Sequence, residues 1–252
     1  MKLTEEMRLR VAKTIGDFIA ADREAVGAAT RWRRPLVGFA DARGEGFRRL
    51  RSIVTEKHYM PEDFLPDATV VVSYFLPFSE EIPDSNVDGR PASQAWATAY
   101  NETNAMAVRL NDHLADVIKS WGYRAAVPQN TLTIPEILKS YWSQRHIAYL
   151  AGLGTFGLNN MMITDMGCCG RIFSVVSDLP ITPDRPRERE ACLFKRDGTC
   201  GLCVRRCPSG ALTKEGFDRV VCQETCRENR GVLGAGCCGK CLVGLPCSVR
   251  LP

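Results

Sequence analysis

The residues best suited to chemistry in this chain are its twelve cysteines, all of which follow position 167. Eight of them form two groups with one spacing pattern: an outlying cysteine, a Cys-x-x-Cys pair and a terminal cysteine beside a proline. The first group is Cys192, Cys200, Cys203 and Cys207, and the second is Cys222, Cys238, Cys241 and Cys247. The first contains Cys-x-x-Cys-x-x-x-Cys-Pro, which matches the last three ligands of the bacterial ferredoxin run. The pattern therefore predicts two thiolate-bound [4Fe–4S] clusters.

The proline beside each terminal cysteine predicts how the two groups share their ligands. In two-cluster ferredoxins the fourth cysteine of each run binds the other cluster. By that rule one cluster takes Cys192, Cys200, Cys203 and Cys247, and the other takes Cys222, Cys238, Cys241 and Cys207. Two positions of the second set stay open, because Cys226 competes with Cys222 and Cys237 competes with Cys238.

Zinc is the main alternative for the paired cysteines, because four thiolates also make a structural zinc site. Eight well-spaced cysteines with a ferredoxin-type Cys-Pro signature favour iron–sulfur clusters. The adjacent Cys168 and Cys169 also have two interpretations. Buried cysteines often serve as small hydrophobic side chains, which we favour here. Reactive thiol chemistry near a cofactor is the alternative.

A glycine motif precedes the cysteines. Gly152, Gly154 and Gly157 fit the Gly-x-Gly-x-x-Gly dinucleotide fingerprint, and Asp178 follows about twenty residues on. That fingerprint follows a strand and opens a helix, whereas here the pattern predicts a helix before it and a strand after it. We therefore reject a dinucleotide site and expect these glycines to allow tight turns or close approach to a flat ligand.

The candidate catalytic residues are His146 and its neighbour Arg145, which directly precede the glycine motif. Histidine titrates in the range that a proton donor needs near neutral pH. A structural role is the alternative, and the residue type alone favours it. No carboxylate pair or Ser-His-Asp arrangement stands out in the sequence.

The segments that must position these residues alternate between helical and strand patterns. Helices are predicted at 4–22, at about 94–121 and from Pro135 to Gly152, and strands at 67–78, 123–127, 156–164 and 171–179. Residues 31–66 are mixed and rich in turns. A proline-rich linker follows Leu179, and short Cys/Gly loops follow the linker. The pattern predicts an α+β protein, with an α/β body over 1–182 and a small ferredoxin-like two-cluster module over 183–252.

Composition and charge agree with a soluble globular protein, at 45% hydrophobic and 25% charged residues. No signal-peptide pattern is present and the longest apolar run is too short to span a bilayer, so we expect a cytoplasmic protein with no membrane partner. From position 185 onward there are 13 basic and 7 acidic side chains. This excess is best explained as an offset to the negative charge of the clusters, and contact with nucleic acid is the alternative.

The segments AGLGTFGLNNMMIT, RIFSVVSDLPITPD and CGLCVRRCPSGAL occur here in the order found in the epoxyqueuosine reductase family. The chain resembles that family over roughly residues 67–250, most closely over 151–210. In the family, and in the related reductive dehalogenases, a flavoreductase-like α/β body binds cobalamin, and two [4Fe–4S] clusters deliver electrons to its cobalt. The resemblance implies cobalamin as a further cofactor here, with Gly152, Gly154 and Gly157 bordering the corrinoid pocket.

Three departures make the chain similar to a short, divergent member of that family. The family carries an Asp-x-x-Pro-x-x-Glu segment, whose Asp donates a proton, but the stretch LKSYWSQRHIAYL offers no matching Asp. The usual Lys of the glycine loop is Leu158, and the second cysteine run is rewritten as CCGKCLVGLPC. We therefore expect the scaffold to be kept and the tRNA substrate not to be.

The leading functional hypothesis is an iron–sulfur reductase. Two clusters would relay electrons from a low-potential ferredoxin- or flavodoxin-type donor to a corrinoid or small-molecule substrate in the α/β body. A non-catalytic ferredoxin-type electron-transfer protein that serves a partner enzyme is the alternative. An enzyme that acts on tRNA is a third candidate, supported only by the basic tail.

Overall fold

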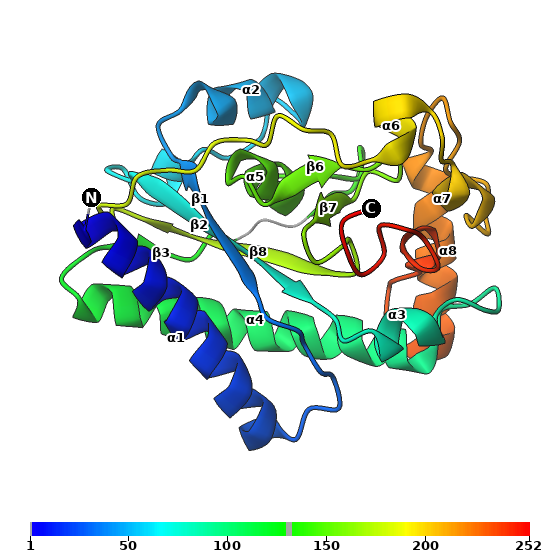
Figure 1. The fold of residues 1–252 in the computed structure, drawn as a ribbon, viewed down its shortest axis with the longest axis horizontal. Helices are drawn as coiled ribbons and strands as arrows, with labels where there is room; N and C mark the ends of the chain where they lie inside the picture. Colours follow the sequence, from blue (N-terminus) through cyan, green and yellow to red (C-terminus); the bar gives the residue numbers. More distant parts are fainter. Residues whose placement is uncertain (1, 130–132) are drawn as a thin grey trace.

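The computed structural model describes residues 2–129 and 133–252, and a mixed sheet-and-helix body lies at its centre (Figure 1). The main sheet has the order β1–β2–β8–β3, and every neighbouring pair is antiparallel. Its strands are β1 (Leu36–Asp41), β2 (Val70–Pro77), β8 (Gly170–Ser177) and β3 (Ala125–Ala126). Two ribbons complete the strands described: β4 (Thr133–Ile134) with β5 (Lys139–Ser140), and β6 (Gly154–Phe156) with β7 (Met162–Thr164).

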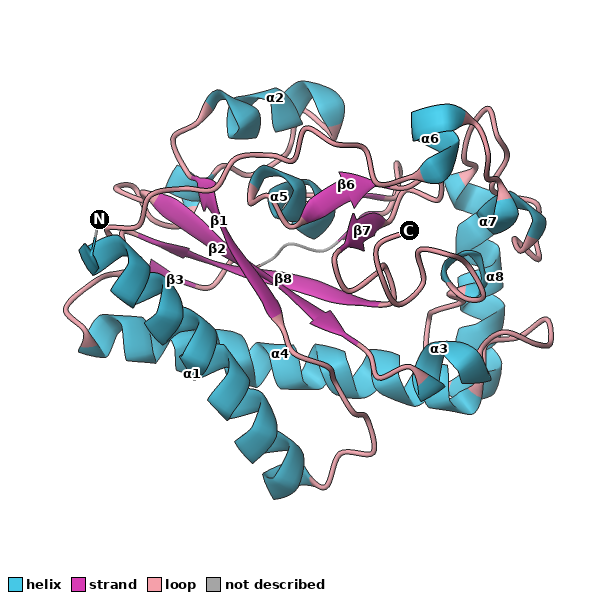
Figure 2. Cartoon of the chain, in the orientation of Figure 1, coloured by secondary structure: helices cyan, strands magenta, loops and turns pink. Residues whose placement is uncertain are grey.

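Helices cover both faces of this sheet (Figure 2). Strand β2 is buried along its whole length, and its alternate side chains enter two different cores. Helices α1 (Lys2–Val26) and α4 (Gln94–Ser120) supply side chains to the first core, and α2 (Glu45–Ile53) and α5 (Gln144–Leu150) to the second. A strand buried on both faces needs an almost continuous apolar sequence, which VVVSYFLP provides.

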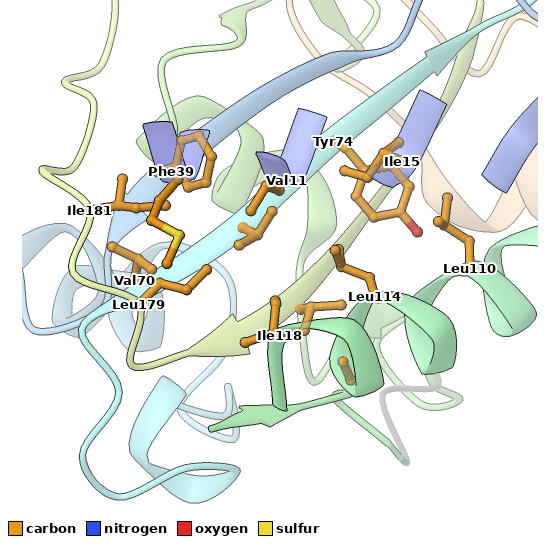
Figure 3. Packing of buried hydrophobic residues seen from close by; sticks show 14 of the residues in the cluster. Val11, Ile15, Phe39, Val70, Tyr74, Leu110, Leu114, Ile118, Leu179 and Ile181 are labelled. Carbon is orange, nitrogen blue, oxygen red and sulfur yellow. The ribbon is translucent and has the colours of Figure 1, made fainter. Parts of the chain in front are cut away.

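The first core packs the N-terminal helix and the long helix together against one face of the sheet (Figure 3). Val11 and Ile15 of α1 are buried against the same cluster as Leu110 and Leu114 of α4. In each pair the spacing of four residues puts both side chains on one face of the helix. The helices predicted at 4–22 and 94–121 and the buried strand predicted within 67–78 are confirmed.

The helix predicted from Pro135 is wrong in its first half. Residues up to Ser140 form the β4–β5 ribbon, and α5 begins only at Gln144. Leu138 has a positive φ of 49°, which a helix does not accommodate. The Trp142 indole is buried and donates to Ser174 Oγ (3.0 Å), and this contact holds the chain in a turn. Tertiary packing therefore overrides the local helical pattern.

Other boundaries also differ from the sequence pattern. The strand predicted at 156–164 is two short strands joined by a turn, closed by the bond from Gly157 N to Met161 O (2.7 Å). Strand β1 and helix α2 lie in the stretch interpreted as mixed. The remaining short helices are η1 (Pro61–Asp63), α3 (Glu81–Ser85), α6 (Leu193–Asp197), α7 (Leu202–Arg205) and η2 (Lys240–Leu242). None of the helices in the described part of the chain is long and apolar enough to cross a membrane.

The cysteine-rich tail contains a helix that was not expected, α8 (Arg219–Leu233). Asp218 caps its start, because the carboxylate accepts bonds from Val220 N and Val221 N (2.9 and 3.1 Å). Gly234 ends it in the left-handed conformation. The prediction that only short Cys/Gly loops follow the linker is therefore wrong.

The tail packs on the body through a third core that mixes residues of both. Cys168 N donates to Cys247 O (2.9 Å) and Cys169 N to Ser248 O (3.0 Å). The buried ammonium of Lys240 donates to Asn86 O (2.9 Å). The boundary predicted between 182 and 183, and the ferredoxin-like character of the tail, stay predictions.

We expect Gly167→Ala to loosen this docking. Gly167 has φ +82°, and an added Cβ would strike the backbone of 248–250. Gly122, with φ +87° and open space around it, is the matched control. Gly122→Ala should cost about 1–2 kcal/mol for its left-handed backbone, and Gly167→Ala about 1–3 kcal/mol more for the clash. Urea unfolding measures both, and equal losses would contradict the docking argument.

Candidate functional site

Four of the predicted ligands line one cavity: Cys192, Cys200, Cys203 and Cys247. They come from three separate segments: Cys192 precedes α6, the Cys200 and Cys203 pair surrounds the start of α7, and Cys247 lies near the C-terminus. The loop of Gly157 to Asn159 closes another side of the cavity. Burial raises the pKa of the Cys203 thiol to about 11. We name this the first cavity.

A second cavity, of about 400 Å³, lies between the body and the tail. Its lining contains six cysteines, which are Cys207, Cys222, Cys226, Cys237, Cys238 and Cys241. The body contributes apolar side chains from α4, among them Trp96 and Tyr100. The four ligands predicted for the second cluster all face this cavity.

The two runs exchange their terminal cysteines across the cavities. Cys247 belongs to the later run but lines the first cavity, and Cys207 belongs to the earlier run but lines the second. Asn159 lines both cavities and donates from Nδ2 to Cys241 O (2.8 Å). Each predicted quartet thus lines one cavity, with Cys226 and Cys237 also lining the second, and the assignment of cluster ligands stays a prediction.

The spacing of these thiols bears on which metal group they could hold. No set of three or more His, Cys, Asp or Glu side chains within residues 2–129 and 133–252 is compact enough to hold a metal ion. A zinc ion with Zn–S bonds of about 2.3 Å would need sulfurs roughly 3.8 Å apart. A cubane places an iron at each of four corners and so accepts thiolates that are further apart. Whether the thiols around these cavities hold a cubane or zinc stays a prediction.

Positive charge surrounds the second cavity, through Arg145, Arg171 and Arg219. Burial lowers the pKa of Arg145 and of Arg171, and in Arg145 the other two guanidinium groups lower it further. Among the ion pairs of the described residues, none joins these arginines to a carboxylate. The thiolates of Cys222 and Cys241 act in the opposite direction on Arg145. The cavity is therefore built to receive negative charge, as a thiolate-bound cluster carries.

The structure separates the two catalytic candidates. Arg145 lines the second cavity and donates to Asn160 O (2.6 Å). His146 lines neither cysteine cavity: its Nδ1 lies 2.8 Å from Ser143 Oγ, and its ring packs against Phe156. Burial first, and Arg145 second, lower the pKa of His146 to about 4. The ring is therefore neutral near pH 7, and its proton-donor role stays a prediction.

The low pKa of His146 predicts a pH dependence of stability. The unfolded chain binds this proton near pH 6.5 and the folded chain only near pH 4. This group therefore does not affect the free energy of unfolding above about pH 6.5. As the pH falls from there toward 4, the free energy of unfolding decreases by up to about 3 kcal/mol. Urea unfolding at pH 7.5 and 4.5 should show a smaller pH effect for His146→Gln than for the wild type. His113→Gln, at an exposed position on α4, is the control, and an unchanged pH effect in the His146 variant would contradict the assignment.

The glycines of the motif lie at different places. Gly157 lines the first cavity. A Cβ at Gly152 would lie 2.6 Å from Arg185 O, and one at Gly154 would strike the backbone of Ile163 in β7. The close neighbours of Gly152 and Gly154 are thus the chain's own backbone, at positions where the sequence suggested either tight turns or a flat ligand. The motif follows α5 and enters β6, as predicted, so its context is not that of a dinucleotide fingerprint.

The vicinal pair Cys168 and Cys169 is buried and lines neither cavity. Cys169 Sγ lies 3.2 Å from Leu242 O. A thiol–thiol contact links Cys168 to Cys247, so the pair lies behind one predicted ligand of the first cavity. This surrounding agrees with the favoured interpretation of the pair as small buried side chains.

Sequence reasoning missed Arg171, Arg219 and Asn159 as residues of the site. Arg171 is on β8 and Arg219 begins α8, so no local pattern connects either to Arg145. For Arg219 the one available signal was indirect: the spacing of four between Cys222 and Cys226 is typical of one face of a helix, and Arg219 belongs to that helix.

No protein-family model matches the chain. A tetrachloroethene reductive dehalogenase of Dehalobacter restrictus is 33% identical over 119 residues, which are 45% of this chain and 19% of the relative. The epoxyqueuosine reductase of Bacillus subtilis is 27% identical over 169 residues, 64% of this chain and 40% of the relative. The chain thus spans less than half the length of these curated relatives.

Solved structures show the same fold. A selenomethionine-labelled epoxyqueuosine reductase superposes with a TM-score of 0.57 at 21% identity, covering 94% of this chain and 66% of that one. An epoxyqueuosine reductase with a tRNA-Tyr stem loop gives 0.56 at 21%, with the same coverage. A catabolic reductive dehalogenase gives 0.57 at 17%, covering 86% and 30%. The resemblance to epoxyqueuosine reductases and reductive dehalogenases is confirmed.

Proposed function

We propose that the chain is an iron–sulfur reductase that holds two [4Fe–4S] clusters and passes electrons to a reactant bound between the body and the tail. The observation that carries the proposal is the exchange of Cys207 and Cys247 between the two cavities. Two independent zinc sites would not need such an exchange. Bound clusters would supply one-electron transfer.

In this proposal, cysteines of the two cavities bind the clusters and nearby arginines balance their negative charge. The first cavity supplies Cys192, Cys200, Cys203 and Cys247, and the second supplies Cys207, Cys238, Cys241 and a thiol from α8. Arg145, Arg171 and Arg219 balance negative charge around the second. Because reduction adds one more negative charge, these arginines favour the reduced state.

The size of the second cavity supports a reactant beside the cluster. It is the larger of the two cavities, although a cluster of the same kind is proposed for each. The space that a cluster would leave free is bordered by the α/β body, where Trp96, Tyr100 and Phe78 supply flat apolar surface. A corrinoid, implied by the resemblance, or a small-molecule substrate would bind there, and a low-potential ferredoxin or flavodoxin would be the donor.

Metal analysis of anaerobically purified protein tests the proposal. We expect about eight irons and eight sulfides per chain and no stoichiometric zinc. A count of about four irons per chain would mean that only one cluster is present. Zinc in place of iron would contradict the electron-transfer proposal. Adding cobalamin to the reduced protein separates an enzyme from a carrier: a bound corrinoid with an altered spectrum supports the reductase, and absence of binding favours a non-catalytic carrier.

The tRNA relation is tested separately. One structural relative is described with a tRNA stem loop, but we expect no specific tRNA binding by this chain. Weak binding that disappears as salt rises would reflect only the basic tail. Saturable binding at physiological salt would contradict this expectation.

A further inference from the structure

The second cavity holds two thiols more than a cubane needs. Four cysteines complete a [4Fe–4S] cluster, and six line this cavity. Cys207, Cys238 and Cys241 are fixed by a Cys-Pro turn and a Cys-x-x-Cys turn. The fourth position must come from α8 or from Cys237.

Helix α8 points two thiols into the cavity, Cys222 and Cys226. They are four residues apart, so they are neighbours on one helical face, with Cβ atoms roughly 5–6 Å apart. Their side chains are in hydrogen-bond contact with each other. Both also lie near Cys238, because a thiolate at Cys238 raises the pKa of Cys226 and a thiolate at Cys222 raises the pKa of Cys238.

The packing of α8 allows either thiol to be used. Asn229 is the single buried side chain among the described residues of this helix, and Val220 and Val232 are 60% and 77% exposed. Asn229 holds the far end, where Nδ2 donates to Cys237 O (2.7 Å). A small rotation or slide of the first two turns therefore breaks few apolar contacts, so the cost of moving one thiol into the place of the other is low.

We propose that Cys222 and Cys226 are interchangeable donors for the fourth ligand position of the second cluster. This inference rests on the proposed function, since it needs a cluster in the second cavity. One thiol binds iron as a thiolate while the other stays beside it as a protonated thiol. Exchange moves one proton from the incoming thiol to the outgoing one and consumes no oxidant or reductant.

The test compares Cys222→Ala, Cys226→Ala and the double variant in the full chain, purified without oxygen. Alanine is used because a serine hydroxyl could itself bind iron. Each single variant should keep about eight irons, with a changed EPR spectrum in the dithionite-reduced state. The double variant should fall to about four irons and keep the EPR signal of the first cluster, which shows that the chain has folded. Glu224→Ala, at an exposed position on the same helix outside the cavity lining, is the control and should keep all the iron and an unchanged EPR spectrum.

Several results would overturn the inference. Loss of four irons in Cys222→Ala alone would make Cys222 the sole ligand, and loss in Cys226→Ala alone would make it Cys226. Loss in both single variants would mean that both thiols are needed together, and eight irons in the double variant would assign the fourth position to Cys237. Wild-type protein with zinc or no iron would instead remove the proposed function, so the two failures are distinguishable.

Discussion

The variant Cys241→Ala is expected to lose about half of the iron, falling from about eight to about four irons per chain, with a matching loss of visible absorbance. Cys241 is deeply enclosed, and burial raises the pKa of its thiol, with Cys238 and Cys222 raising it further. Cys241 lies in the Cys-x-x-Cys turn with Cys238 and not on α8, so we expect neither Cys222 nor Cys226 to take its place. Iron and sulfide analysis after anaerobic purification measures the effect.

Two further variants make this prediction specific. Cys169→Ala removes a fully buried thiol that lines neither cavity, so it should keep all the iron. Cys203→Ala should lose the other half, because Cys203 lies in the first cavity. Full iron in Cys241→Ala, or equal losses in Cys169→Ala, would show that the ligand scheme is wrong.

The same burial predicts how iron uptake depends on pH. Cysteine binds metal as a thiolate, so cluster assembly must release protons. Because burial raises the pKa of Cys203 and Cys241, their thiols are protonated near pH 7 in the metal-free chain. Reconstitution should therefore be slower at low pH and should release protons, an outcome that a pH-stat records.

Removing the positive charge of Arg145 should lower the reduction potential of the second cluster. Arg145 is buried in the cavity, and thiolates of that cavity interact with its charge. With an effective dielectric constant of about 20, two unit charges roughly 8 Å apart interact by about 2 kcal/mol. For one electron this corresponds to a shift of roughly 90 mV toward more negative potential in Arg145→Gln.

A redox titration followed by EPR measures this shift. Arg205→Gln is the matched control, because it removes the same charge from an exposed position on α7. Its potential should stay close to that of the wild type, since solvent screens an exposed charge. An upward shift in Arg145→Gln, or equal shifts in the two variants, would rule out the electrostatic role.

Much of the body was determined by local sequence patterns. The stripe through Leu110 and Leu114 predicts a long amphipathic helix, and VVVSYFLP predicts a strand buried on both faces, because in each case the apolar spacing matches the geometry of one element. The cysteine spacing likewise indicated which thiols line each cavity, whereas their roles as cluster ligands stay predictions. Such spacing is informative because the turns around ligands are short and local.

Only the tertiary structure decided where the remaining parts of the site lie. Arg145, Arg171 and Arg219 are far apart in the sequence, and the approach of α5, β8 and α8 around one cavity brings them together. The helix predicted from Pro135 was shortened because burying Trp142 against Ser174 outweighed local propensity. The sequence left open whether Cys222 or Cys226 is the ligand, and α8 places both thiols side by side at the second cavity. A sequence pattern fixes contacts between near neighbours, whereas charge balance, burial and room for a reactant depend on contacts between distant segments.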